Sequence, residues 1–270
     1  MPSDRETSIR RGIEVLLSLA SEEAVAEGGM GVTRISEQLE REKSQVSRAL
    51  KVLAEYGLVE RNRDALTYRL GWRIYALAQL AGQPRILEEA RPRLHRLAAE
   101  MGERAHLSVL QGSEVLTLLS ESPGRAVEAV GWVGRATPAY CTSAGRALLL
   151  DHAPDSLDLL FRDVELRRLA PRTPTDLKTV KKRIEEARAA GYVISDEEFE
   201  QGLISVAAPV RDAGGAIAAA LNVSAPKFRF ENRVKTAAKA VRDVADELSA
   251  TLRANGPGPD AEEPAAVGAA

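Results

Sequence analysis

The sequence contains little of the chemistry that builds metal centres or disulfide frameworks. Its 270 residues include a single cysteine, Cys141, and three scattered histidines, His95, His106 and His152. One thiol excludes an internal disulfide framework and a cysteine-based zinc site, and the histidines do not have metal-ligand spacing. We therefore expect no metal and no other cofactor.

Long apolar segments are missing too. No run approaches the roughly 20 residues that a membrane-spanning helix needs, and Asp4 and Glu6 stand where a signal peptide would have an apolar core. A composition of 44% hydrophobic and 28% charged residues is typical of a soluble globular protein, and the length suits two domains. We expect a cytoplasmic protein with no membrane partner.

Charge of either sign is nearly balanced. The net charge of −2 argues against a protein that coats nucleic acid indiscriminately, so DNA binding would have to come from local clusters. Basic residues gather in two stretches, residues 41–51 and 61–73. Such a cluster can equally be the solvated face of a helix, and only its place in the helical pattern distinguishes the two.

The first 55 residues show helical periodicity. Apolar residues recur every three or four positions from residue 8 to residue 20: Ile9, Ile13, Leu16, Leu17 and Ala20. They predict an amphipathic helix, followed by a short second helix with Thr33 as its N-cap. A third helix is expected from Ser44. Its inward-facing residues are Val46, Ala49, Leu50 and Leu53.

Two short helices joined by a tight turn predict a helix-turn-helix whose second helix lies in the major groove. Gln45 and Arg48 suit the edges of adenine and guanine, whereas Ser44, Ser47 and Lys51 are better placed to hold phosphates. A hairpin over residues 59–70 would form a wing. The residues that we assign to DNA contacts are Arg41, Lys43, Ser44, Gln45, Ser47, Arg48, Lys51, Arg61, Arg63 and Arg69.

The second half alternates strand and helix patterns. A helix over 86–101 precedes a hairpin of strands 106–110 and 115–119, and a helix over 175–190 ends at Gly191 before a short strand at 192–194. Strands 203–210 and 216–224 form a second hairpin, and a helix over 234–252 follows. This order predicts an α+β domain of GAF or PAS type with an antiparallel sheet.

Small and polar residues suggest a pocket on that sheet. Alternation places Ser205 on one strand face, and Asn222 and Ser224 on one face of the next strand. These residues would form a pocket wall, although small side chains also let a helix pack closely. On the other side, Ser143, Ala144 and Gly145 open a helix whose free amides attract an anion, unless Thr142 or Ser143 is only a cap.

Two rival functions have weaker support. Glu197, Glu198 and Glu200 lack a partner base or nucleophile, so we expect them to be exposed, with Asp196 pointing inward, and we expect no enzyme. Cys141 precedes a helix and lies near Arg146, which would lower a thiol pKa and allow a redox-sensing regulator. A buried, inert thiol is the competing interpretation.

The runs Gly57-Leu58-Val59-Glu60-Arg61 and Tyr68-Arg69-Leu70-Gly71 resemble the winged helix-turn-helix of IclR-type bacterial transcription regulators, and the layout downstream is similar to theirs. The resemblance implies that the apolar helix after residue 71 is a linker that helps the subunits to dimerise. Together with the pocket argument it gives these effector-binding candidates: Ser143, Ala144, Gly145, Ser195, Asp196, Ser205 and Asn222.

The same resemblance sets the expected domains and partners. We expect a winged helix-turn-helix domain over 1–71, a linker helix over 72–85, an effector-binding domain over 86–254 and a disordered tail over 255–270. Residues 141–143, 202–205 and 219–224 look like the subgroup that regulates aromatic-acid catabolism through protocatechuate, 4-hydroxybenzoate or β-ketoadipate. The expected function is a ligand-responsive regulator of a catabolic operon, a homodimer or dimer of dimers that binds operator double-stranded DNA and a small aromatic or dicarboxylic acid.

Overall fold

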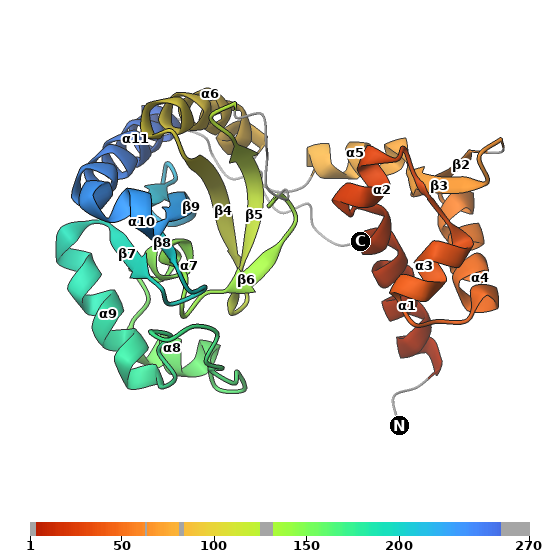
Figure 1. Cartoon of the computed structure of the whole chain (residues 1–270), viewed down its shortest axis with the longest axis horizontal. Coiled ribbons are helices and arrows are strands. Elements are labelled where there is room, and N and C mark those ends of the chain that lie inside the picture. Colours follow the sequence, from red (N-terminus) through yellow and green to blue (C-terminus); the bar gives the residue numbers. More distant parts are fainter. Residues whose placement is uncertain (1–3, 63, 81–83, 125–131, 255–270) are drawn as a thin grey trace, which may run out of the picture. The chain divides into compact units, whose positions relative to one another are not determined.

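The chain divides into two compact units, residues 1–84 and 85–270. The computed structural model describes residues 4–62, 64–80, 84–124 and 132–254 (Figure 1). Arg63, the tail at 255–270 and part of the expected linker segment therefore lie outside the described residues. None of the described helices is both long enough and apolar enough to cross a membrane.

The first unit is a small helical domain with a three-stranded sheet in the order β1-β3-β2. Its core is formed mainly by the inner faces of α1 and α4 together with Ile35 and Val59. The elements are α1 (Asp4–Leu19), α2 (Glu22–Ala26), β1 (Met30–Gly31), α3 (Val32–Gln38), α4 (Lys43–Glu55), β2 (Val59–Asn62), β3 (Thr67–Leu70) and α5 (Trp72–Leu80).

Two expectations for this unit are wrong. The structure buries Val15 and Leu19 of α1, whereas the predicted inner residues Ile9 and Leu17 are 69% and 65% exposed. The reason is that α3, α4 and β3 pack against a different side of α1 from the one that its periodicity favoured. Helix α3 begins at Val32, so Thr33 does not cap it, because Met30 and Gly31 first pair with β3 as an unexpected short strand.

The second unit is an antiparallel sheet covered by helices on both faces, which confirms the predicted α+β class. The strand order is β6-β5-β4-β9-β8-β7, so the two predicted hairpins meet along β4 and β9. Its elements are α6 (Pro84–Met101), β4 (Arg104–Gln111), β5 (Glu114–Glu121), β6 (Ala136–Pro138), α7 (Ser143–Leu148), α8 (Pro154–Leu160), α9 (Leu177–Ala190), β7 (Val193–Asp196), β8 (Leu203–Arg211), β9 (Ile217–Pro226), α10 (Lys227–Phe230), η1 (Glu231–Arg233) and α11 (Val234–Ala254).

The two faces of the sheet have different partners. Helices α6 and α11 cover one face and bury the apolar residues of β8 and β9 in a continuous core. Helices α7, α8 and α9 lie on the other face, where the sheet contributes the small residues Ala207 and Ala220 (Figure 1). Small side chains on this face leave space between the sheet and α7, and the cavity described below lies there.

Local chemistry fixes the turns around that space. The Thr142 hydroxyl accepts a hydrogen bond from the Gly145 amide and so caps α7, as one of the two sequence interpretations proposed. Gly191 ends α9 in the left-handed region with φ of 70°, and Gly215 has φ of 85° in the β8–β9 turn. Gly191 therefore ends its helix as the sequence predicted.

Candidate functional site: a basic helix face and a polar cavity

Helix α4 presents a polar outer face in the first unit. Val46, Leu50 and Leu53 are buried, while Ser44, Ser47, Arg48 and Lys51 are exposed and Gln45 is half-buried. A mere four residues, 39–42, separate α3 from α4, which is the tight connection of a helix-turn-helix. The first turns of α4 thus carry the residue types that read base edges and hold phosphates.

The other assigned basic residues differ in their surroundings. Arg41 forms an ion pair with Glu14 at 3.1 Å, and Arg69 pairs with Glu60 across the hairpin at 2.9 Å. The Arg61 guanidinium lies 5.7 Å from the Tyr68 ring centre. Lys43 is exposed at the start of α4, and Arg63 is outside the described residues. In the free protein the wing arginines are partly engaged, whereas the α4 face is open.

The second unit has a cavity of about 50 Å³ between the sheet and α7. Most of its polar wall comes from strand residues on one face of the sheet. Ser205 lies opposite Ser224 on the neighbouring strand, and His106 lies opposite Asn222. The cavity is lined by His106, Ser108, Val115, Thr117, Trp132, Thr137, Thr142, Ser143, Ala144, Phe199, Leu203, Ser205, Asn222 and Ser224.

Four of the seven predicted effector residues meet in this cavity: Ser143, Ala144, Ser205 and Asn222. The Ser143 hydroxyl donates a 2.8 Å hydrogen bond to the Ser205 hydroxyl, so the α7 side and the strand side touch across the space. Gly145 is not in the lining. A Cβ at Gly145 would lie 2.3 Å from the Cα atom of Ala139, so its missing side chain accommodates that backbone instead.

Ser195 and Asp196 also lie outside the lining. The Ser195 hydroxyl donates to the Cys141 carbonyl at 2.9 Å. Asp196 forms ion pairs with Arg172 and, at 2.8 Å, with Lys227, and it keeps 29% of its side chain exposed. The inward orientation expected for Asp196 is therefore wrong, because β7 ends at this residue and two cations hold its carboxylate near the surface.

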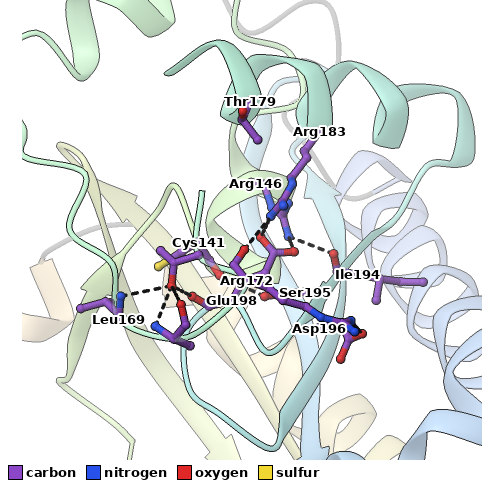
Figure 2. A network of polar contacts seen from close by, with 12 residues as sticks. Cys141, Arg146, Leu169, Arg172, Thr179, Arg183, Ile194, Ser195, Asp196 and Glu198 are labelled. Carbon is purple, nitrogen blue, oxygen red and sulfur yellow. Dashed lines mark hydrogen bonds and ion pairs between the residues drawn. The ribbon is translucent and has the colours of Figure 1, made fainter. Parts of the chain in front are cut away.

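The inward carboxylate belongs to Glu198. This residue was expected to be exposed, but 8% of its side chain is accessible and it pairs at 2.9 Å with Arg146, which is 2% exposed. Figure 2 shows that Arg183 of α9 reaches the same carboxylate. Arg146 also donates to the Ile194 carbonyl at 2.9 Å. Burial lowers the pKa of Arg146 and the Glu198 charge opposes that shift. The pair ties the loop after β7 to α7 and α9.

Several lining residues have no counterpart among the sequence candidates. His106 is 4% exposed, and its pKa is lowered to about 3 by burial and by the nearby Arg104 charge, so the imidazole is neutral at physiological pH. Trp132 packs edge to face on His106 with ring centres 5.8 Å apart, and Phe199 follows at 6.3 Å from Trp132. The alternation of His106 with Ser108 along β4 was a usable signal, whereas Trp132 and Phe199 come from connecting segments.

The polar lining of the cavity is uncharged. No lysine, arginine, aspartate or glutamate among the described residues lines it, and its polar groups are hydroxyls, an amide and a neutral imidazole. In the described residues no group of three or more histidine, cysteine, aspartate or glutamate side chains could hold a metal ion. Burial, then the Glu198 charge, raises the pKa of the buried Cys141 thiol to about 12, which disfavours the thiolate that the redox-sensing alternative needs.

A helix-turn-helix with a basic outer face and a second domain with a polar cavity define a ligand-responsive transcription regulator. Family models agree: the IclR helix-turn-helix domain matches residues 8–63, and the bacterial transcriptional regulator IclR C-terminal domain matches residues 78–250. The chain belongs to the IclR family. Its relatives are named as regulators, and the chain is a regulator and not an enzyme.

Similar proteins include two named regulators. The HTH-type transcriptional regulator BhcR of Paracoccus denitrificans is 31% identical over 82% of this chain and 80% of its own length. The Pca regulon regulatory protein of Pseudomonas putida is 33% identical over 82% of this chain and 75% of its own. An IclR homologue from Microbacterium hydrocarbonoxydans, solved with 4-hydroxybenzoate, is 26% identical, with a TM-score of 0.76 over 92% of this chain and 99% of that one.

Proposed function

We propose that this regulator controls a catabolic operon in response to a small aromatic acid that binds in the cavity between α7 and the sheet. The observation that carries the proposal is the make-up of the cavity, which combines two aromatic rings, Trp132 and Phe199, with a wall of neutral hydrogen-bonding groups. An aromatic acid has a flat apolar body for the rings and one polar end for the wall.

The described residues that line the cavity carry no charged side chain, which favours an aromatic monoacid over a dicarboxylic acid. A single carboxylate can be held by hydroxyl donors, for which the Ser143 and Ser205 pair is available. A second carboxylate in the same small space would be buried without a cation, which is costly. The similarity to the Pca regulon regulatory protein and to the homologue solved with 4-hydroxybenzoate supports the same ligand class.

The size of the cavity links binding to a change of shape. A cavity that holds benzene measures about 150 Å³, whereas this one measures about 50 Å³. An aromatic ring therefore enters only if part of the wall moves, and the side chains of Trp132 and Phe199 are part of that wall. A ligand that binds the widened form shifts the population towards it, which is the basis of ligand control.

For DNA binding we propose a homodimer or a dimer of dimers on operator DNA, with Gln45 and Arg48 at base edges. Large apolar side chains on the surface of the first unit support self-association: Ile9 and Ile13 of α1 are 69% and 52% exposed, and Trp72 and Leu80 of α5 are 74% and 87% exposed. Two copies of α4 would read two half-sites.

A thermal-shift screen of the purified protein against aromatic monoacids and dicarboxylic acids tests the effector class. At a ligand concentration of 100 Kd the folded state gains about 2.7 kcal/mol, which is a rise in melting temperature of roughly 5–11 °C for a domain of this size. Ser205→Phe fills the cavity and should abolish the rise. Ser156→Phe, at an exposed position on α8, is the matched control and should keep it.

The proposal fails if no aromatic acid raises the melting temperature while a dicarboxylic acid does, or if Ser205→Phe responds like the native protein. Oligomeric state is tested separately by analytical ultracentrifugation. Ile13→Glu together with Leu80→Glu should convert the assembly to monomers; an unchanged sedimentation coefficient would contradict the proposed interface.

A further inference from the structure

His106 stands out among the cavity residues because one of its ring nitrogens is unsatisfied. Its Nε2 atom lies 3.4 Å from the Ser224 hydroxyl. Its Nδ1 atom is buried and has no hydrogen-bond partner among the residues that the structure describes. The described residues contain a few other buried side-chain atoms without a partner, but none of those belongs to a residue that lines the cavity. Buried polar atoms normally have partners, so an orphan in a binding cavity points to a ligand group.

The neighbouring hydroxyls already have partners. Ser143 donates to Ser205 at 2.8 Å, and Ser108 lies 3.5 Å from Thr117. Each of these hydroxyl groups can rotate to form a hydrogen bond with a ligand and still keep its present partner, since a hydroxyl is both donor and acceptor. The Nδ1 atom of His106 differs, because it gains a first partner when the ligand arrives.

The form of the imidazole indicates which ligand group fits. A buried neutral ring carries a proton on one nitrogen, and the contact with Ser224 can set either tautomer. A ligand hydroxyl satisfies Nδ1 in both cases, because it donates to a bare nitrogen and accepts from a protonated one. A carboxylate satisfies only the protonated form and fits better beside the two hydroxyls of Ser143 and Ser205.

The aromatic residues beside His106 indicate that its Nδ1 atom would lie next to the ring of a bound ligand. Trp132 packs edge to face on the imidazole, and the Arg135 guanidinium stacks on Trp132 with 4.5 Å between its central carbon and the ring centre. A ligand ring that widens the cavity at Trp132 therefore arrives next to His106.

We propose that His106 selects the effector by a hydrogen bond between its Nδ1 atom and a hydroxyl group on the ligand's ring. The effector is then a hydroxylated aromatic monoacid, and the unsubstituted acid is the analogue that the cavity rejects. This inference rests on the proposed function of the cavity, and it adds the residue and the ligand group that set its specificity.

The test compares 4-hydroxybenzoate, 3,4-dihydroxybenzoate and benzoate by isothermal titration calorimetry with the full-length protein. The native protein should bind at least one hydroxylated acid about tenfold or more tightly than benzoate, because benzoate leaves Nδ1 buried and unpaired. His106→Phe should remove that preference by weakening the hydroxylated acid, with benzoate affinity changed less than about threefold.

Two further variants separate the ring nitrogens. In His106→Asn the amide lies near the position of Nδ1, so the preference for a hydroxyl should survive in part. In His106→Gln the amide lies near the position of Nε2, so the preference should be lost. A merely structural role for the imidazole would not distinguish these two variants, and circular dichroism melts without ligand confirm that each is folded.

The outcomes separate the two proposals. If benzoate and both hydroxylated acids bind the native protein equally, or if His106→Phe and His106→Gln keep the preference, the role of His106 is overturned while the aromatic-acid function stands. If none of the three acids binds but a dicarboxylic or neutral compound raises the melting temperature, both proposals are overturned.

Discussion

Replacing Glu198 with glutamine is the sharpest test of how the second unit is held together. The substitution keeps the size of the side chain and removes its charge, leaving Arg146, which is 2% exposed, with the Ile194 carbonyl and no anion. Removing one member of a buried ion pair typically costs about 3–5 kcal/mol because the remaining charge stays buried. Glutamine can still accept one hydrogen bond, so we expect the lower end of that range.

A loss of about 3 kcal/mol corresponds to a fall in melting temperature of roughly 6–12 °C for a domain of 150–250 residues. Differential scanning calorimetry of the full chain measures it, because the two units can give separate transitions. Glu197→Gln is the matched control. Its carboxylate pairs with Lys227 near the surface, where both side chains are 22% exposed, so its loss should lower the melting temperature much less than the loss of the Glu198 charge.

A paired replacement separates charge from packing. The double variant Arg146→Met with Glu198→Leu removes both members of the buried pair and leaves Arg183, which is 31% exposed and so reaches solvent. We therefore expect most of the lost stability to return. The reasoning is refuted if Glu198→Gln costs no more than Glu197→Gln, since that would mean that water or other groups compensate Arg146 as well as the carboxylate does.

Three other predictions follow from single residues. Arg48→Ala should weaken binding to an operator selected in vitro by roughly 5–150-fold, measured by fluorescence anisotropy, and leave effector binding intact. A loss of DNA affinity no larger than that of the exposed control Arg162→Ala would contradict the assignment. Gly145→Ala should destabilise the second unit by about 3 kcal/mol, because its Cβ would meet the Ala139 backbone. Gly12→Ala, with open space around it, should stabilise the first unit slightly. Urea midpoints of both variants equal to those of the native protein would refute this. Burial and, to a smaller extent, the Arg104 charge keep the pKa of His106 at about 3, against 6.5 in the unfolded chain. As the pH falls, the unfolded state therefore takes up a proton before the folded state does. The free energy of unfolding should fall by about 2 kcal/mol between pH 7 and pH 5. Urea titrations of the native protein and His106→Phe should show this pH-dependent loss in the native protein alone.

Features set by local sequence were predictable. The alternation along residues 203–224 anticipates a shared face, and the structure pairs Ser205 with Ser224 and Ala207 with Asn222. Thr142 caps its helix, and Gly191 ends α9, because capping depends on a few neighbouring residues. The cavity wall that the strands form could therefore be inferred from the sequence.

Features set by tertiary contacts were not predictable. Either side of α1 could have faced inward, since both Ile9 and Val15 are apolar, and the choice depended on α4 and β3. Glu198 turns inward because Glu197 adopts a left-handed conformation with φ of 53°, which breaks the strand alternation. The aromatic residues of the cavity come from connecting segments, whose path periodicity does not describe.

The cavity and the buried ion pair share two structural elements. Helix α7 contributes Ser143 to the cavity from its first turn and Arg146 to the ion pair from its second. On the other side, Phe199 of the cavity directly follows Glu198 in the loop that closes β7 against β8. A ligand that moves Phe199 outward must therefore pull on a loop whose neighbouring residue is held by Arg146 and by Arg183 of α9. We therefore expect the ion pair to resist widening of the cavity, and Glu198→Gln to change the affinity for a large ligand although Glu198 does not line the cavity; equal affinities of the native and variant proteins in isothermal titration calorimetry would contradict this.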